Sequence, residues 1–513
     1  DGDDKGDDPS DGDDKGDDPS DGDDKGDDPS DGDDKGDDPS DGDDKGDDPS
    51  DGDDKGDDPS DGDDRGDDPS GGDNNGDHPT GGDSGTPAPD DADESDRIEV
   101  DFSLNVQTVQ VGVARLVNVD HQQIITIVVD PDKLQEALDT DETSITISMS
   151  VLTPADAVIG TLNGQMVKDM EDRDTVLQLH TSNASYSLPV RELDIEELAG
   201  QFGADVSLQD IEIKVEIAAP SAEQLQMLDR LIQDQDHVIL APPVQFTVRA
   251  VYGDQEIEIT QFETYIERTI RIPDGVDPDK ITTAVVIEPD GTLRHVPTKV
   301  MIMNGQAVAV INSLTNSTYA LIWNPVRFED VEGHWAEEAI NDMGSRKIVN
   351  GVGEQAYAPN QAITRAEFAA MIVRALGLRT VSEDAAFLDV PSADWYSGAI
   401  RTAYAYHLIN GYPDGTFRPM ELITREQAMV VLSKAMELTG LKDKLDSASA
   451  EEVFGIYQDA DQVSAWARQG VADTVSAGII VGRSHQELAP QASITRAEAA
   501  VILQRLLQHS DLI

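Results

Sequence analysis

The sequence predicts a multidomain chain with three unlike parts: a disordered Asp-rich repeat tail, a β-rich, sandwich-like middle region and an all-α C-terminal region. Three observations predict this. Residues 1–70 repeat one acidic unit, residues 97–325 contain many stretches of alternating apolar and polar residues, and the last third carries one helical pattern three times. Alternation with period two indicates strands, and a recurring helical unit indicates a repeat architecture with a shared core.

The tail consists of seven copies of Asp-Gly-Asp-Asp-Lys-Gly-Asp-Asp-Pro-Ser, the last with Arg65 in place of Lys. A linker rich in Gly, Pro, Asp and Thr follows, to residue 96. Each unit has five Asp and one basic residue, and Pro is its only apolar residue. Such a segment cannot bury a core and repels itself, so residues 1–96 are predicted to be a disordered acidic spacer.

The closely spaced Asp residues of the tail also raise the question of calcium. A defined calcium loop needs alternating ligands, a Gly at the sharp turn and a closing bidentate Glu. The ten-residue unit contains no Glu, and Pro9 and its equivalents interrupt it. We therefore expect weak counter-ion binding of calcium to the tail and no defined metal site.

The middle region, residues 97–325, is predicted to form one or two β-rich domains that serve as a stalk or interaction region. Strand period occurs at 98–106, 123–129, 144–150, 175–179, 211–217, 244–251 and 281–287, and helical patterns occur at 131–138, 195–202 and 221–232. Asp290-Gly291 and Asn304-Gly305 are predicted hairpin turns. We interpret 161–165 as a turn and the acidic residues at 169–174 as a solvated loop. No catalytic constellation stands out, so neither enzyme activity nor a cofactor is predicted.

Composition excludes several classes of partner. The chain has 105 acidic and 37 basic residues, so a nucleic acid would be repelled and is not an expected partner. No apolar run reaches the length of a membrane span, about 18 residues. The absence of Cys excludes disulfides and thiol chemistry. The chain begins at Asp1, within a repeat and without a signal peptide, so we expect it to be the C-terminal part of a longer product.

The C-terminal third repeats Trp, Gly and Arg at fixed spacing. Trp335 lies 16 residues before Gly351, which lies 14 residues before Arg365. The same spacings separate Trp395, Gly411 and Arg425 in a second copy and Trp466, Gly482 and Arg496 in a third. We predict three units, residues 326–380, 385–440 and 455–510, each consisting of a helix, an irregular loop and a second helix. In the first helix of the first unit, Trp335 and Ile340 are predicted to face inward.

Each second helix is predicted to begin with a capping box, in which Thr is followed three residues later by Glu or Gln. The pairs are Thr364 with Glu367, Thr424 with Gln427 and Thr495 with Glu498. The motif arginine then occupies the first helical position, at an exposed helix start whose free amides favour anions. Since a guanidinium suits a carboxylate, we predict an anion site in each unit. The alternative, an internal ion pair with an acid such as Asp330, stays open.

Residues 326–510 resemble a triplet of S-layer homology domains. The first copy contains Phe328-Glu-Asp-Val, His334-Trp-Ala, Asn350-Gly and Ile363-Thr-Arg-Ala-Glu. The resemblance implies a pseudo-threefold helical bundle that binds pyruvylated secondary cell-wall polysaccharide non-covalently in grooves between the units. It also implies the polysaccharide-binding residues Arg365, Arg425, Arg496, Gly351, Gly411, Gly482, Asp330, Asp389, Asp459, Trp335, Trp395 and Trp466. For the Trp residues we expect core or groove-wall packing rather than direct stacking on the ligand.

Two copies depart from the family pattern. The second reads Arg-Glu-Gln where the first reads Arg-Ala-Glu. The third has Ala465 where the first has His334, and its loop reads Gly-Arg-Ser-His. We therefore expect the third groove to contribute least, and Arg496 to matter less than Arg365 or Arg425.

The resemblance implies a non-catalytic surface protein that its three repeats anchor to wall polysaccharide. Its location would be extracellular, in the cell wall or S-layer of a Gram-positive bacterium. The β-rich region resembles the module that often precedes this anchor in Gram-positive surface proteins. The alternative is the anchor part of an extracellular polysaccharide-degrading enzyme whose catalytic domain lies outside this chain.

Deletion of residues 1–96 is predicted to leave the thermal unfolding of the remaining chain unchanged, because the tail offers no apolar surface to bury. Calorimetric melts of the full chain and of residues 97–513 would measure this. Dispersed amide resonances from the tail, with or without calcium, would contradict the prediction.

Overall fold

A computed structural model describes residues 97–139, 144–234, 237–288, 291–353, 355–381, 387–445, 450–484 and 486–513. The predicted acidic spacer, with its weak calcium binding, lies outside the described residues and stays a prediction. The described part of the chain contains no helix that is both long and apolar enough to cross a membrane.

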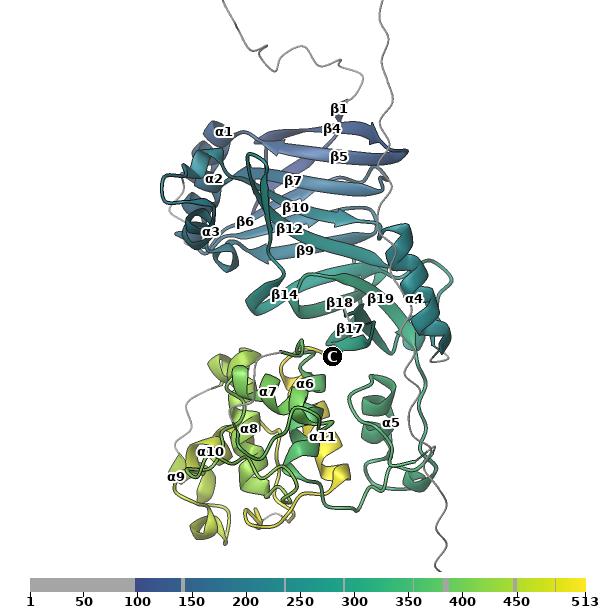
Figure 1. Ribbon diagram of the computed structural model, residues 1–513, viewed down its shortest axis with the longest axis vertical. Coiled ribbons are helices and arrows are strands. Elements are labelled where there is room, and N and C mark those ends of the chain that lie inside the picture. Colours follow the sequence, from purple (N-terminus) through teal and green to yellow (C-terminus); the bar gives the residue numbers. More distant parts are fainter. Residues whose placement is uncertain are drawn as a thin grey trace, which may run out of the picture. The chain divides into compact units, whose positions relative to one another are not determined.

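The middle region forms two β-sheets (Figure 1). The larger, in spatial order, contains β1 (Arg97–Ile98), β4 (Gly112–Val119), β5 (Gln122–Val129), β7 (Ala157–Asn163), β10 (Glu212–Ala218), β12 (Val244–Tyr252), β19 (Thr318–Trp323), β15 (Thr283–Ile287) and β16 (Leu293–Val296), with β11 (Val238–Ile239) on β19 and β13 (Gln255–Glu258) on β12. The smaller contains β17 (Thr298–Met303), β18 (Gln306–Thr315), β14 (Gln261–Arg271), β9 (Ala184–Pro189), β8 (Val176–His180), β6 (Thr146–Ser150), β2 (Asp101–Leu104) and β3 (Gln107–Val109). The prediction of a β-rich middle region is confirmed, and each of the seven predicted strand stretches overlaps a strand.

Alternation of side chains explains why these segments form strands. In β10 every second residue is buried, so one face of the strand joins the core while the other is more exposed. Phe102 and Met149 from the smaller sheet share one hydrophobic core with Val215 and Phe246 from the larger. One core therefore runs through both sheets.

The helices of the middle region are α1 (Pro131–Leu138), α2 (Gly164–Glu171), α3 (Ile195–Phe202) and α4 (Ala222–Asp234). The helical patterns predicted α1, α3 and α4, but α2 was missed. The predicted turn at 161–165 was wrong, because Asn163 caps a short helix through Met166 N–H at 2.9 Å. The predicted solvated loop at 169–174 is confirmed only in its second half: Asp169 lies in the helix, whereas Asp172 and Asp174 are exposed in the turn that follows it. Glu171 lies in that helix and accepts a hydrogen bond from Ile195 N–H.

The predicted hairpin at Asn304-Gly305 joins β17 to β18. Asn304 has φ 52° and Gly305 φ 80°, the left-handed conformations that a two-residue turn of this type requires. The corresponding Asp290 lies outside the described residues.

Arg268 on β14 is completely buried in the core of the sheets. It donates hydrogen bonds to the carbonyl of Ile266 at 2.8 Å, the carbonyl of Ser313 at 3.2 Å and Asn316 Oδ1 at 2.7 Å. Its guanidinium is surrounded by the rings of Tyr186, Phe246 and Tyr319. Cation–π contacts and neutral oxygens thus replace a carboxylate partner around this charge.

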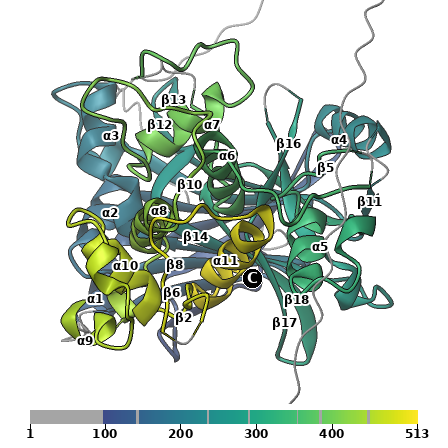
Figure 2. The same cartoon turned by 90° about the horizontal axis from the view of Figure 1, so that it is seen from below.

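The C-terminal region contains three helical repeats (Figure 2). Repeat 1 carries α5 (Glu337–Ser345) and α6 (Arg365–Ala375), repeat 2 carries α7 (Ser397–Ala405) and α8 (Arg425–Leu438), and repeat 3 carries α10 (Arg468–Ser476) and α11 (Arg496–His509). A short α9 (Ala450–Phe454) precedes repeat 3. The first helix of each repeat packs against the second helix of the repeat before it: α7 on α6, α10 on α8 and α5 on α11. The three repeats therefore form a closed ring around one core.

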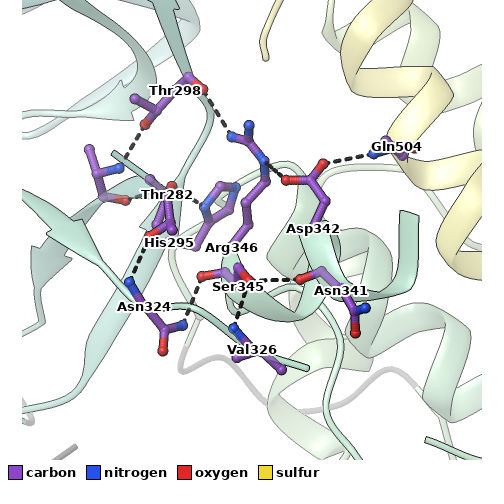
Figure 3. A network of polar contacts seen from close by, with 12 residues as sticks. Thr282, His295, Thr298, Asn324, Val326, Asn341, Asp342, Ser345, Arg346 and Gln504 are labelled. Carbon is purple, nitrogen blue, oxygen red and sulfur yellow. Dashed lines mark hydrogen bonds and ion pairs between the residues drawn. The ribbon is translucent and has the colours of Figure 1, made fainter. Parts of the chain in front are cut away.

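A polar network links the β-rich region to this ring (Figure 3). Arg346, the C-cap residue directly after α5, donates hydrogen bonds to Asp342 at 2.9 Å and to the carbonyl of Thr298 in β17 at 3.0 Å. Gln504 of α11 donates to the other oxygen of Asp342 at 2.7 Å. One arginine thus connects the smaller sheet with the first and third repeats.

Replacement of Arg268 by Ala is expected to lower the free energy of unfolding by about 3 kcal/mol, because it leaves buried carbonyls unsatisfied and opens a cavity between three rings. Urea denaturation would measure the change. The matched control is Arg191→Ala, whose side chain is 58% exposed and forms a surface ion pair worth less than about 1 kcal/mol. Equal effects of the two substitutions would contradict the structural role given to Arg268.

Candidate functional site

The capping boxes at the starts of α6, α8 and α11 are all present, as predicted. Thr364, Thr424 and Thr495 each accept a hydrogen bond from the N–H three residues later. The side chain of Glu367, Gln427 or Glu498 in turn accepts a hydrogen bond from the Thr N–H. The three predicted helix starts are therefore confirmed.

The N-terminal amides of these helices are not free, contrary to the expectation from sequence. Arg365 N–H donates to the carbonyl of Glu421 and Ala366 N–H to that of Pro419, both at 2.9 Å. The same pattern recurs from α8 to Ala492 and Pro490, and from α11 to Gln361 and Pro359. Because the loop of the following repeat takes up these donors, the helix ends themselves offer no open anion site.

The motif arginines are buried, which also corrects the prediction of exposed helix starts. Arg365, Arg425 and Arg496 are 9%, 4% and 6% exposed. Each Nε donates to a carbonyl of the following repeat, in the order Phe417, Leu488 and Tyr357, at 2.9, 2.8 and 2.7 Å. Each arginine is therefore a joint between repeats, and its truncation would also affect stability.

Two of the three arginines form internal ion pairs. Arg425 Nη1 lies 3.1 Å from Glu498, and Arg496 Nη1 lies 3.3 Å from Glu367. The partner is the capping-box acid of the following repeat, and not Asp330. Burial lowers the pKa of Arg425, while the charge of Glu498 acts in the opposite direction. Burial likewise lowers the pKa of Arg365, whose equivalent neighbour is the neutral Gln427.

The motif aspartates hold the loops that precede the second helices. Asp330 accepts hydrogen bonds from the consecutive N–H groups of Tyr357 and Ala358, at 2.8 and 2.7 Å. Asp389 binds the N–H groups of Phe417 and Arg418 in the same way, and Asp459 those of Leu488 and Ala489. These carboxylates position the loop whose carbonyl then meets the arginine of the preceding repeat.

The motif glycines allow close approach of the loop to the ring of the Phe-x-Asp motif. A Cβ at Gly411 would lie 2.3 Å from the ring of Phe387. At Gly351 it would lie 2.7 Å from the carbonyl of Ala356, and at Gly482 2.4 Å from that of Ser484. Any side chain would displace the loop, so these positions require glycine.

The motif Trp residues lie on the surface, so the prediction that Trp335 faces inward was wrong, although Ile340 is buried as expected. Trp335, Trp395 and Trp466 are 65%, 64% and 59% exposed. Each Trp comes just before the first helix of its repeat, and the residues that this helix buries lie on a face that does not include the Trp. Two of these rings line grooves between repeats, consistent with the groove-wall alternative.

The first groove, called here the Arg365 groove, has a volume of about 420 Å³. Arg365 of repeat 1, the loop at 408–413 of repeat 2 and Trp466 of repeat 3 all contribute to it. The second, the Arg425 groove, is about 270 Å³ and combines Arg425, the loop at 480–483 and Trp335. The equivalent third position is named the Arg496 groove by analogy with the other two; there Arg496 donates hydrogen bonds to Glu367 and to the carbonyl of Asn350. Each site is thus assembled from different repeats.

Sequence reasoning missed a second cation near each motif arginine. Lys434 lines the Arg365 groove and Arg505 the Arg425 groove. Arg374 donates to the carbonyl of Ile348, next to the Arg496 groove. These three residues lie nine positions after the motif arginines, and that shared spacing was the signal available in the sequence.

The loop in which the third copy departs from the family pattern belongs to a different groove from the one expected from sequence. Its variant loop, with Arg483, lies beside Arg425 and not beside Arg496. Arg483 donates two hydrogen bonds to Glu498, each at 3.1 Å. The argument that singled out Arg496 as the least important arginine therefore no longer holds, because the altered loop belongs to the Arg425 groove.

Comparison with known proteins agrees with this geometry. The family model of the S-layer homology domain matches residues 327–369, 386–429 and 456–500. An amylopullulanase of Thermoanaerobacterium thermosulfurigenes is 29% identical over 366 residues, which cover 68% of this chain and 19% of that protein. That match is longer than the three domains, so it also includes part of the β-rich region.

Two further relatives match shorter segments. The exoglucanase XynX of Acetivibrio thermocellus is 36% identical over 200 residues, 39% of this chain and 18% of that protein. A cellulosome-anchoring protein of the same species is 32% identical over 160 residues, 30% of this chain and 34% of that protein. The chain thus spans about a third or less of the length of these relatives. Residues 327–500 are three S-layer homology domains, and they place the chain outside the cell, in the cell wall or S-layer of a Gram-positive bacterium.

Proposed function

We propose that the three repeats anchor the chain non-covalently to a pyruvylated secondary cell-wall polysaccharide. The supporting observation is the Arg365 groove, where two cations meet an apolar and aromatic wall. The charged residues that line this groove are Arg365 and Lys434. A guanidinium offers two parallel donors to a carboxylate, so a pyruvyl ketal with its single carboxylate matches this chemistry.

The exposed Trp residues would provide the wall against which a sugar packs. Trp466 lines the Arg365 groove together with Tyr412, Pro413 and Phe417. A large aromatic ring offers apolar area for the carbon face of a sugar, while the cations hold its acidic substituent. By the equivalence of the repeats, we assign Trp335 and Trp395 the same role in the other two grooves.

The remaining motif residues would position the site rather than touch the ligand. Asp330, Asp389 and Asp459 already use both carboxylate oxygens on loop amides. Gly351, Gly411 and Gly482 permit the loop conformation. We keep the proposed boundaries of the parts: 1–96 for the spacer, 97–325 for the β-rich stalk or interaction region, and 326–380, 385–440 and 455–510 for the repeats.

A second candidate is that the chain is the anchor part of an extracellular polysaccharide-degrading enzyme. The relatives include proteins named amylopullulanase, exoglucanase and endo-1,4-beta-xylanase, of which this chain covers at most a fifth. Another relative is named as a cellulosome-anchoring protein, which favours anchoring without catalysis. No catalytic domain is evident within the described residues. The complete reading frame would distinguish the two candidates.

Sedimentation with purified cell walls tests the anchor. The full chain is expected to pellet with walls that retain the polysaccharide and to stay in the supernatant after the polysaccharide is removed. Trp466→Ala is expected to weaken wall binding by about tenfold, the loss of about 1.4 kcal/mol of aromatic contact.

The matched control is Leu388→Ala on the same ring of repeats, because Leu388 is 86% exposed and does not line either described groove. Both variants should melt like the wild type. Wild-type protein that stays in the supernatant with intact walls would refute the anchor, and equal binding by the two variants would refute the role of Trp466.

A further inference from the structure

The three grooves differ in how the motif arginine is neutralised. In two of them the capping-box glutamate divides its two oxygens. Glu498 Oε2 accepts the N–H of Thr495 at 2.9 Å, while Oε1 accepts Arg425 Nη1 at 3.1 Å. Glu367 does the same with Thr364 and with Arg496. One carboxylate therefore caps its own helix and pairs with the arginine of the preceding repeat.

Gln427 performs only the first of these two tasks. Its Oε1 accepts the N–H of Thr424 at 3.2 Å, so the cap is kept. Its second polar atom is Nε2, which donates to the hydroxyl of Tyr412 at 3.3 Å. Because an amide nitrogen is a donor, it cannot accept a hydrogen bond from Arg365. Within the described residues, the side chain of Arg365 donates hydrogen bonds only to the carbonyls of Phe417 and Asn410, through Nε and Nη2.

The Arg365 groove therefore contains an arginine that forms no ion pair with any carboxylate of the described residues. Its guanidinium lies 4.4 Å from the centre of the Phe417 ring and 5.1 Å from that of Tyr412, which orient it without taking its charge. Lys434 adds a second cation, and burial lowers the pKa of this amine as well. The charges of Glu421 and Asp389 act on Arg365 and that of Glu437 on Lys434, but neither cation forms an ion pair with an acid among the described residues. Two partly desolvated cations without a paired acid favour a bound anion.

The second departure in repeat 2 also acts on this groove. Glu426, where the other repeats have Ala, is 3% exposed and accepts hydrogen bonds from the N–H and hydroxyl of Ser464, at 2.9 and 2.8 Å. Ser464 lies two residues before Trp466, the aromatic wall of the groove. Glu426 thus holds the segment that carries the wall, and both of its carboxylate oxygens accept hydrogen bonds outside the groove lining.

The Arg425 groove shows the opposite arrangement. Glu498 forms ion pairs with both Arg425 and Arg483. Burial acts to raise the pKa of this carboxyl group. Hydrogen bonds from Arg483 and Thr495, together with the charges of both arginines, nevertheless hold the pKa below its ordinary value. An incoming carboxylate would have to displace or approach this acid. The groove is also smaller, about 270 Å³ against about 420 Å³.

We propose that the Arg365 groove is the principal carboxylate-binding groove of this chain, and that Gln427 is the residue that makes it so. This inference rests on the proposed anchoring function and specifies the site that carries it. Its ligand class is a saccharide with one carboxylate, held by Arg365 and Lys434 and packed against Trp466. Glu367 and Glu498 act as internal competitors for the carboxylate in the other two grooves.

The test is the exchange of amide and acid at one position in the full chain. Gln427→Glu keeps the capping box, because Glu serves as the cap in the other two repeats, so its melting temperature should match the wild type. The new carboxylate should pair with Arg365 and weaken binding of the probe by about tenfold or more, the loss of one charge-assisted contact. The probe is a hexosamine methyl glycoside with a 4,6-pyruvate ketal, measured by titration calorimetry, and its methyl ester is the uncharged control.

Two further variants complete the design. Glu498→Gln is expected to strengthen binding at the Arg425 groove and to raise the number of probe molecules bound. Gln508→Glu adds the same charge at an exposed position of α11 outside both described grooves and should leave affinity unchanged.

The outcomes separate the two proposals. Wild-type binding to walls and probe with an unchanged affinity of Gln427→Glu would overturn the role of Gln427 and leave the anchor standing. Equal losses of probe affinity in Gln427→Glu and Gln508→Glu would show that the loss follows net charge alone. That result would also overturn the role of Gln427. A wild-type chain that binds neither walls nor probe would overturn both the inference and the anchoring function.

Discussion

The structure of the C-terminal region depends on one interaction made three times, the capping of each second helix by the loop of the next repeat. A helix start leaves amides unpaired, and here the first two N–H groups of α6, α8 and α11 donate to carbonyls of another repeat. The buried arginine at the same position adds a further bond across the junction. Because α11 closes the cycle onto repeat 1, no repeat satisfies its polar groups alone, and the three are expected to unfold together.

The same interaction explains why the grooves lie where they do. The arginine that joins two repeats is also at the base of the space between them, so the structural joint and the proposed ligand contact are one residue. Nε and Nη2 of each arginine donate to loop carbonyls of the following repeat, and Nη1 meets a capping acid at Arg425 and Arg496 but not at Arg365 among the described residues. Replacement of Glu by Gln427 can therefore change ligand chemistry without a change in the helix cap.

The β-rich region also contains a buried arginine, but different partners satisfy its guanidinium. Arg268 carries a charge in the middle of the core, and aromatic faces with neutral oxygens satisfy it instead of an acid. Toward the repeats, Arg346 connects Asp342 with the carbonyl of Thr298. In both regions a guanidinium is used because its five donors can satisfy several carbonyls at once.

Sequence alone determined the β-rich and helical parts, the capping boxes, the required glycines and the family, because these depend on local periodicity, turn chemistry and fixed spacing. It missed α2, whose eight residues resemble a turn. It also placed Trp335 inside and the arginines outside, since periodicity does not show what a neighbouring repeat covers. Only the tertiary structure decided that each groove draws on different repeats and that Arg365 faces Gln427 rather than an acid, because those contacts join residues far apart in the chain.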